Sequence, residues 1–234
     1  MSDYKTLQTR LVHSGGLEPR ARGAVITPIF QSANFEQADP DTYAAVTYMR
    51  LNNTPNHRVL ATKIAAIEGT ESAMVAASGM AAITAALMSI LSSGDHLLVQ
   101  DNVYGGTRTF LTQDASRFGI THTNIDPMKP HTWEAARTEN TKAIYVEGIS
   151  NPLLGVGDLQ AIVTFAKEHG LITLIDNTFL SPVLFRPAEI GFDIVLHSAT
   201  KYLNGHSDIV AGVIAGSAEH VGAALHQLNH FGGS

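Results

Sequence analysis

Residues 197–206 read His-Ser-Ala-Thr-Lys-Tyr-Leu-Asn-Gly-His, and they follow the short run Phe-Asp-Ile-Val-Leu at 192–196. The apolar centre and short length of that run are typical of an interior β-strand. In open α/β sheets, the carboxyl ends of the strands form the crevice that binds ligands. This strand would therefore deliver Lys201, flanked by Ser198 and Thr200, to such a crevice. For an isolated lysine the alternative is a surface position, and the rest of the chain favours a site.

Composition excludes several classes of protein. The chain has 234 residues, of which 44% are hydrophobic, so it can bury a substantial core. A formal net charge of −6 argues against binding to nucleic acid or to an anionic membrane. The absence of cysteine excludes disulfides, thiolate metal sites and thiol nucleophiles. The first residues lack the apolar core of a signal peptide, and no apolar run is long enough to span a bilayer. We therefore expect a cytoplasmic protein.

The first 45 or so residues differ from the rest of the chain. Glycines and prolines interrupt them, at Gly15, Gly16, Pro19, Pro28 and Pro40 among others, and no helical period persists. We therefore expect an extended N-terminal arm over residues 1–55 and a folded domain over residues 56–234.

Apolar runs and helical patterns alternate from residue 56 onward. The strand candidates are 73–77, 96–99, 143–146, 171–175 and 192–196, and helical patterns cover 60–67, 81–91 and 158–169. Asp158 suits the start of the last of these helices, and Gly170 suits its end. Strands separated by amphipathic helices predict an α/β fold with a mostly parallel sheet that helices cover on both faces.

Polar residues fall where the predicted strands end. Seven of them lie at or shortly after the end of an apolar run: Ser78, Asp101, Tyr104, Glu147, Asn151, Asp176 and Lys201. Any one of them alone suits a turn or a helix cap. Because the ends of parallel strands meet at one edge of the sheet, the seven together predict a shared site.

The residue types at this edge suit pyridoxal phosphate. Lys201 can form a Schiff base with an aldehyde cofactor, and we expect it to be buried, which favours the neutral amine. Asp176 can pair with the pyridine nitrogen and keep the ring an electron sink. The alternative for Asp176 is an Asx turn.

Phosphate and ring recognition also have candidates. The segment Ser78-Gly79-Met80 turns from a strand into a helix, whose first N–H groups can bind a phosphate. Tyr104, in a glycine-rich turn, can stack on the cofactor ring, and the alternative for it is half-buried packing.

Three motifs together resemble the Cys/Met-metabolism family of pyridoxal-phosphate enzymes. They are Ser-Ala-Thr-Lys-Tyr at 198–202 with Gly-His-Ser-Asp at 205–208, Ser-Gly-Met-Ala-Ala at 78–82, and Val-Tyr-Gly-Gly-Thr at 103–107. The family includes cystathionine γ-synthase, cystathionine β- and γ-lyases and methionine γ-lyase, and the resemblance runs from Thr9 to the end of the chain. It implies the large domain of a fold-type-I pyridoxal-phosphate-dependent transferase.

The resemblance also implies a role for each matched residue. Lys201 would form the Schiff base and carry protons, while Tyr104 would stack on the ring and assist proton transfer. Asp176 would pair with the pyridinium nitrogen, and Asn151 would lie near the phenolic oxygen. The phosphate would be held by Ser78, Gly79, Met80, Ser198 and Thr200. Tyr48 and Arg50 would reach the phosphate of a neighbouring subunit. The resemblance therefore implies a homodimer or a homotetramer built as a dimer of dimers.

Two features depart from the family pattern. The order Asn53-Thr54-Pro55 replaces the usual Asn-Pro-Thr. Family members also continue well beyond the length of this chain, through a C-terminal small domain that supplies the arginine for the substrate carboxylate. We therefore expect the arm and the large cofactor-binding domain, without the small domain.

The expected function is that of a C–S lyase or γ-replacement enzyme of trans-sulfuration. Its substrate would be cystathionine or a related L-amino acid with a leaving group at Cβ or Cγ. One alternative is a truncated chain that binds the cofactor without turnover, and another is a different reaction on the same cofactor, such as transamination or decarboxylation. No metal is expected, since His226 and His230, four residues apart, fit a solvated helix face better than a ligand pair.

Overall fold

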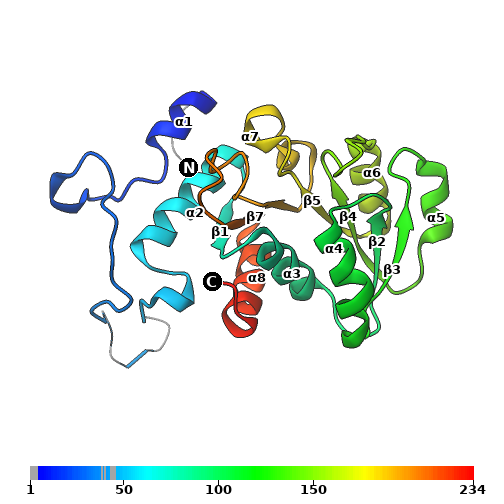
Figure 1. Cartoon of the computed structure of the whole chain (residues 1–234), viewed down its shortest axis with the longest axis horizontal. Helices are drawn as coiled ribbons and strands as arrows, with labels where there is room; N and C mark the ends of the chain where they lie inside the picture. Colours follow the sequence, from blue (N-terminus) through cyan, green and yellow to red (C-terminus); the bar gives the residue numbers. More distant parts are fainter. Residues whose placement is uncertain (1–4, 38, 40, 43–45) are drawn as a thin grey trace.

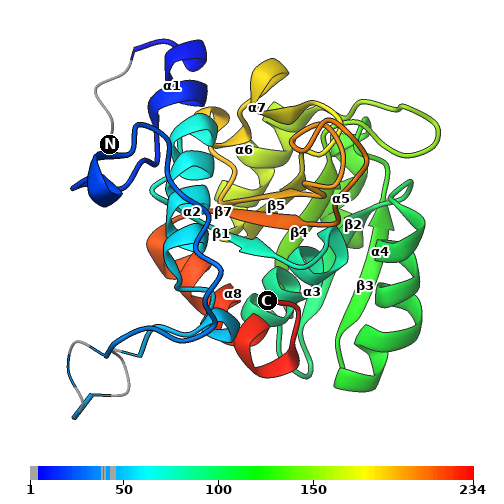
Figure 2. The same ribbon diagram turned by 60° about the vertical axis from the view of Figure 1, so that its left-hand side comes forward.

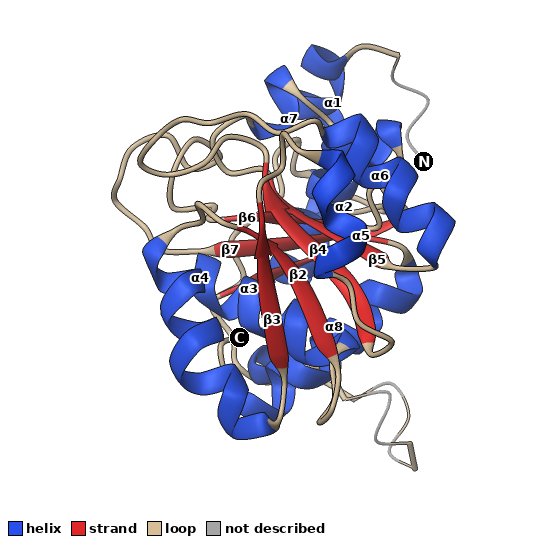
Figure 3. Cartoon of the chain, turned by 90° about the vertical axis from the view of Figure 1, so that its right-hand side faces the viewer, coloured by secondary structure: helices blue, strands red, loops and turns tan. Residues whose placement is uncertain are grey.

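The computed structural model describes residues 5–37, 39, 41, 42 and 46–234 of the chain. Its centre is a seven-stranded sheet in the order β1-β7-β6-β5-β4-β2-β3 (Figure 3). The strands are β1 (Ser72–Ala76), β2 (His96–Gln100), β3 (Thr121–Ile125), β4 (Thr141–Glu147), β5 (Ile172–Asp176), β6 (Ile194–His197) and β7 (Gly212–Gly216).

One strand of the sheet runs against the others. β7 pairs in antiparallel fashion with both of its neighbours, β1 and β6, whereas every other pair of neighbouring strands is parallel. Because β7 is reversed between them, β1 and β6 point the same way. The carboxyl ends of six strands therefore lie at one edge of the sheet, and the predicted α/β fold with a mostly parallel sheet is confirmed.

Helices cover both faces of the sheet (Figure 3). One face carries α3 (Gly79–Ile90), α4 (Gly105–Thr109) and α8 (Ala218–Phe231), and its core includes Leu87, Leu196 and Leu228. The other face carries α2 (Pro55–Glu68), α5 (Trp133–Ala136) and α6 (Leu159–His169), and its core includes Trp133 and Ile162. Burial on both faces explains why β2, β6 and β7 are buried throughout their length.

The helix limits follow the capping residues. Asp158 accepts a hydrogen bond from the Ala161 N–H at 2.9 Å, so it caps the start of α6 as predicted. Gly170 ends the same helix in the left-handed region, at φ 64°. The short helix α7 (Ser181–Leu184) follows β5.

The N-terminal segment contains a helix that the sequence pattern did not predict. α1 (Leu7–His13) forms because Thr6 accepts a hydrogen bond from the Thr9 N–H and caps it, and the helix packs against α2. The expectation that no helix persists in the arm is therefore wrong over these residues. The other described residues of the segment follow the side of α2 away from β3 (Figures 1 and 2), and Val25, Ile26 and Ile29 are at least 80% exposed.

The segment ends where α2 begins, at Pro55. Within the described residues, no helix combines the length and the apolar composition needed to cross a membrane.

Candidate active site

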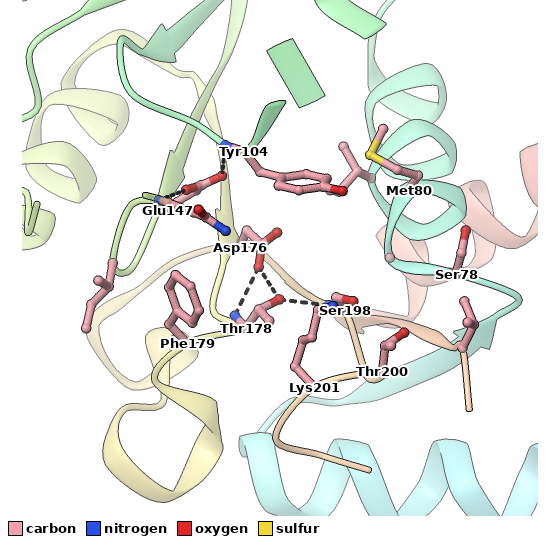
Figure 4. Close-up of a pocket in the computed structure, with 15 residues that line it drawn as sticks. Ser78, Met80, Tyr104, Glu147, Asp176, Thr178, Phe179, Ser198, Thr200 and Lys201 are labelled. Carbon is pink, nitrogen blue, oxygen red and sulfur yellow. Dashed lines mark hydrogen bonds between the residues drawn. The ribbon is translucent and has the colours of Figure 1, made fainter. Parts of the chain in front are cut away.

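A cavity of about 300 Å³ opens at the carboxyl edge of the sheet. Six of the seven polar residues predicted to meet there line it, and Asp101 is the exception, since it is exposed and lies outside the lining. The full lining is Ser78, Gly79, Met80, Ile83, Tyr104, Glu147, Ile149, Asn151, Asp176, Thr178, Phe179, Ser198, Thr200, Lys201 and Val210 (Figure 4). The cavity is at the lower end of the size range of small-molecule sites.

A single hydroxyl links the end of β5 to the turn that carries the lysine. Asp176 Oδ1 accepts hydrogen bonds from the Thr178 N–H at 3.0 Å and from the Thr178 hydroxyl. The same hydroxyl oxygen accepts from the Ser198 N–H at 2.8 Å. The bond from the Thr178 N–H is that of an Asx turn, so Asp176 forms the turn and lines the cavity as well. Its other oxygen is directed toward the centre of the cavity (Figure 4).

The surroundings of Asp176 favour a cationic partner. Burial raises the pKa of this carboxyl, and the two hydrogen bonds from Thr178 oppose that shift. A carboxylate that is desolvated in this way is stabilised by a positive charge beside it. A protonated ring nitrogen in the cavity would supply that charge.

The start of α3 forms a second wall of the cavity. Ser78 caps the helix by accepting a hydrogen bond from the Ala81 N–H at 3.0 Å. A Cβ added to Gly79 would lie 2.8 Å from Ser198 Cβ, and one added to Gly212 would overlap the Ser78 carbonyl. The first turn of α3 therefore lies directly against the Ser198 turn. Because the first N–H groups of a helix have no acceptor within it, this wall suits an anion.

Gly79 is expected to tolerate no larger residue. Gly79→Ala should destabilise the fold by about 1–3 kcal/mol, because the new methyl group would force α3 and the Ser198 turn apart. Urea unfolding measures this. Gly222→Ala in α8 is the matched control, since an added Cβ there meets nothing within 4 Å. The control should gain about 1 kcal/mol, and equal losses in both variants would contradict the close contact.

Tyr104 presents its ring to the cavity from the loop after β2. Tyr104 is 47% exposed, and its ring extends between Asp176 and Met80 (Figure 4). A Cβ added to Gly106 would lie 2.6 Å from Tyr104 Cε1, so glycine at this position leaves room for the ring. An accessible aromatic face of this kind can stack on a flat ligand.

Lys201 lies at the rim of the cavity. Its side chain is exposed, so the expected burial of this lysine is wrong for the described residues. The reason is that Lys201 lies in a turn, where its N–H donates to the Ser198 carbonyl at 3.1 Å, and not within the strand. Thr200 holds the turn to the start of β7 through a hydrogen bond from the Ala211 N–H to its hydroxyl oxygen, at 3.1 Å.

Tyr48 and Arg50 lie outside the cavity lining. Their side chains pair with each other, with the Arg50 guanidinium carbon 5.6 Å from the centre of the Tyr48 ring. Asn53 accepts a hydrogen bond from the Tyr48 N–H at 2.9 Å, and Thr54 takes the N-cap position of α2. The altered order Asn53-Thr54-Pro55 thus still gives a regular helix start.

Residues 8–234 match the model of the family described as Cys/Met metabolism PLP-dependent enzyme. The chain belongs to this family.

Relatives in the family share much of the sequence. Cystathionine beta-lyase MetC of Bacillus subtilis (strain 168) is 45% identical over 97% of this chain and 58% of its own length. Cystathionine gamma-lyase of the same organism is 40% identical over 94% of this chain and 57% of its own length. The crystal structure of cystathionine gamma-lyase from Lactobacillus plantarum complexed with L-serine superposes with a TM-score of 0.90 at 36% identity, covering 98% of this chain and 60% of that one. This chain therefore spans less than two thirds of the length of these relatives.

The cavity fits pyridoxal phosphate, the cofactor of the family. Asp176 offers a desolvated carboxylate for the ring nitrogen, and the start of α3 offers N–H donors for the phosphate. Tyr104 offers a ring face, and Lys201 offers the amine. The cavity thus offers candidate partners for the ring nitrogen, the ring face, the phosphate and the aldehyde carbon of the cofactor.

Several lining residues could not be assigned from the sequence. They are Ile83, Ile149, Thr178, Phe179 and Val210, and for Glu147 the sequence predicts a place at a strand end and no role. Thr178 could have been found from the sequence, because it lies two residues after Asp176, and an Asx turn brings the N–H of that position to the aspartate side chain. No sequence pattern marks the apolar lining residues, because the same residue types fill the core.

The two histidines of α8 lie outside the cavity lining. His226 and His230 are exposed on the helix, with their ring centres 4.2 Å apart. No cluster of three or more His, Asp or Glu residues that could hold a metal occurs in the part of the chain that the structure describes.

Proposed function

We propose that this chain forms the cofactor site of a C–S lyase or γ-replacement enzyme of sulfur amino-acid metabolism. The observation that carries the proposal is the convergence of Lys201, Asp176, Tyr104 and the start of α3 on one cavity. Residues 56–234 would be the cofactor-binding large domain, and residues 1–55 the arm.

Each group of the cofactor would have its own partner. Asp176 would hold the ring nitrogen, Tyr104 one ring face and Asn151 the phenolic oxygen. The phosphate would bind the N–H groups of Gly79 and Met80 together with the hydroxyls of Ser78, Ser198 and Thr200. When bound, the cofactor supplies an electron sink for the negative charge that develops at the substrate Cα.

The residues of the chain would bind the substrate amine and move its protons. The Lys201 amine would hold the cofactor in the absence of substrate, and in its presence would take the proton from the substrate Cα. The Tyr104 hydroxyl would assist proton transfer to the leaving group. Asp176 would keep its negative charge throughout and hold the ring nitrogen protonated.

The names of the relatives support cystathionine as the substrate to test first. We expect the chain with pyridoxal phosphate to release a 2-oxo acid and ammonia from L-cystathionine. Chromatography identifies the product: pyruvate would indicate β-elimination and 2-oxobutyrate γ-elimination. Formation of cystathionine from cysteine and an activated homoserine would indicate γ-replacement. Release of an amine with CO₂, or of a transaminated product, would contradict the proposal.

A second candidate is a chain that binds the cofactor without turnover. The cavity lining supports it, since Lys201 is the sole cation among the lining residues that the structure describes, and none of them is an arginine. A substrate carboxylate would then lack a bidentate partner. Cofactor absorbance without any product from cystathionine would favour this candidate over the first.

We also propose that the chain assembles as a homodimer or a dimer of dimers. The position of Tyr48 and Arg50 outside their own cavity supports a role at the phosphate of a neighbouring subunit. The exposed Val25, Ile26 and Ile29 of the arm support a surface that another subunit covers. Sedimentation equilibrium measures the assembly, and a monomer at micromolar concentration would contradict this proposal.

A further inference from the structure

Glu147 connects two loops that carry candidate cofactor residues. Its Oε1 accepts a hydrogen bond from the Tyr104 N–H at 2.6 Å, and its Oε2 accepts one from the Asn151 N–H at 3.2 Å. Figure 4 shows the carboxylate between the two backbone segments. One side chain therefore fixes the backbone at both positions.

The sheet places this carboxylate beside that of Asp176. Glu147 ends β4 and lies opposite Asp176, which ends β5, in the parallel register. Directly opposed residues of adjacent strands point to the same face, so both carboxylates meet the cavity. Gln100 at the end of β2 accepts a hydrogen bond from the Glu147 N–H at 3.1 Å and donates one to the Asn102 carbonyl at 3.2 Å. Glu147 is thus held from β2 as well as by its own strand.

A carboxylate in this position is costly for the fold. Glu147 is 3% exposed, and burial, together with the negative charge of Asp176, raises its pKa to about 7. A neutral residue would avoid that cost. The Tyr104 and Asn151 N–H groups, however, bind different oxygens of Glu147, and glutamine would place an NH₂ donor where one of those oxygens lies. The geometry therefore matches a glutamate and no neutral side chain of its length.

We propose that Glu147 is a positioning residue, which sets the ring of Tyr104 and the side chain of Asn151 against the cofactor by binding both backbone N–H groups. The proposal rests on the cofactor site proposed above. Tyr104 presents the stacking face from the loop after β2, and Asn151 lies in the loop after the neighbouring strand β4, so a shift of either loop would alter how the cofactor is held.

Glu147→Gln tests the proposal, with Asp193→Asn as the matched control. Asp193 also accepts a backbone N–H, that of Thr173 at 2.8 Å, but it lies at the start of β6 and outside the cavity. Residue-resolved hydrogen exchange of the chain without cofactor is measured first. In Glu147→Gln the Tyr104 or the Asn151 amide should exchange at least about tenfold faster, whereas Asp193→Asn should leave both of those amides unchanged.

Titration with pyridoxal phosphate is the second measurement. Glu147→Gln should raise the Kd about tenfold and weaken the visible circular dichroism of the bound cofactor, which reports how the ring is held. Asp193→Asn should leave the Kd and the circular dichroism unchanged, even if it lowers the thermal stability as much as Glu147→Gln does.

Three results would overturn the proposal. The first is unchanged exchange and unchanged Kd in Glu147→Gln. The second is an equal loss of cofactor affinity in Asp193→Asn, since that would reduce Glu147 to a general contribution to stability. The third is fast exchange of the Tyr104 or the Asn151 amide in the unaltered chain. This measurement needs no variant, so it applies even if Glu147→Gln does not fold. If the Tyr104 and Asn151 amides are protected but the chain binds no cofactor, the proposed cofactor site is overturned. The two hydrogen bonds to Glu147 would still stand.

Discussion

Replacing Lys201 with alanine should abolish the visible absorbance that the chain gains with pyridoxal phosphate. It should also lower any turnover by at least about a thousandfold, because alanine can neither form the covalent link nor move a proton. The fold should be unaffected, since the Lys201 side chain is exposed at the cavity rim. Absorbance spectra and unfolding curves of the purified chain and variant measure both effects.

Lys142→Ala is the control for this experiment. Lys142 is also exposed, but it lies near the start of β4, away from the cavity. It should keep the absorbance and the turnover. Loss of colour in both variants would show that lysine attachment is not specific to the cavity, and retained colour in Lys201→Ala would assign the link to another amine.

Asp176→Asn should give the second largest effect. Asparagine can still accept the hydrogen bonds from Thr178, but it carries no charge to hold a ring nitrogen protonated. A hydrogen bond between charged groups contributes about 1.5–3 kcal/mol, so the Kd for pyridoxal phosphate should rise roughly 10- to 150-fold. Turnover at saturating cofactor should fall as well, because a neutral ring is a weaker electron sink. Fluorescence titration and initial rates measure the two effects.

The stability of the same variant provides an independent check. Because burial raises the pKa of Asp176, removing the charge should not destabilise the cofactor-free fold at neutral pH. A variant that unfolds more easily yet binds the cofactor as well as the unaltered chain would contradict the role assigned to Asp176.

The sequence was sufficient to predict the elements that follow simple periodic patterns. Buried strands such as β4 and β5 are mostly apolar runs, and α6 shows an apolar stripe between Asp158 and Gly170. Strand ends in an α/β sheet meet at one edge, so six of seven strand-end residues were correctly predicted to share a site.

Other elements lack such patterns. β3 has a partly exposed sequence, Thr-His-Thr-Asn-Ile, as expected for a strand at the edge of the sheet, so no apolar run marks it. β7 is Gly-Val-Ile-Ala-Gly, and its reversed direction depends on a return from β6 that local sequence does not specify. α1 depends on one capping threonine and on packing against α2, which no local period shows.

Within the site, residue types were predictable and contacts were not. Glu147 was visible at the end of a strand, but its two acceptors bind backbone N–H groups of distant loops, whose paths are fixed by tertiary structure. The exposure of Lys201 was mispredicted for a related reason, because the path of the turn after β6, and not the strand before it, decides where the lysine lies.

The antiparallel strand β7 affects the order in which the chain can fold during its synthesis. Among the described strands, β1 pairs with β7 alone, so Ser72–Ala76 has no neighbour in the sheet until the ribosome has produced Gly212–Gly216. The Ser78 turn, which directly follows β1, depends on the same pairing for its place against Ser198. Closing such a large loop is entropically costly and slow. The binding cavity is therefore among the last parts of the molecule to assemble during synthesis, and a nascent chain that ends before Gly216 lacks part of the strand that holds its Ser78 wall in place.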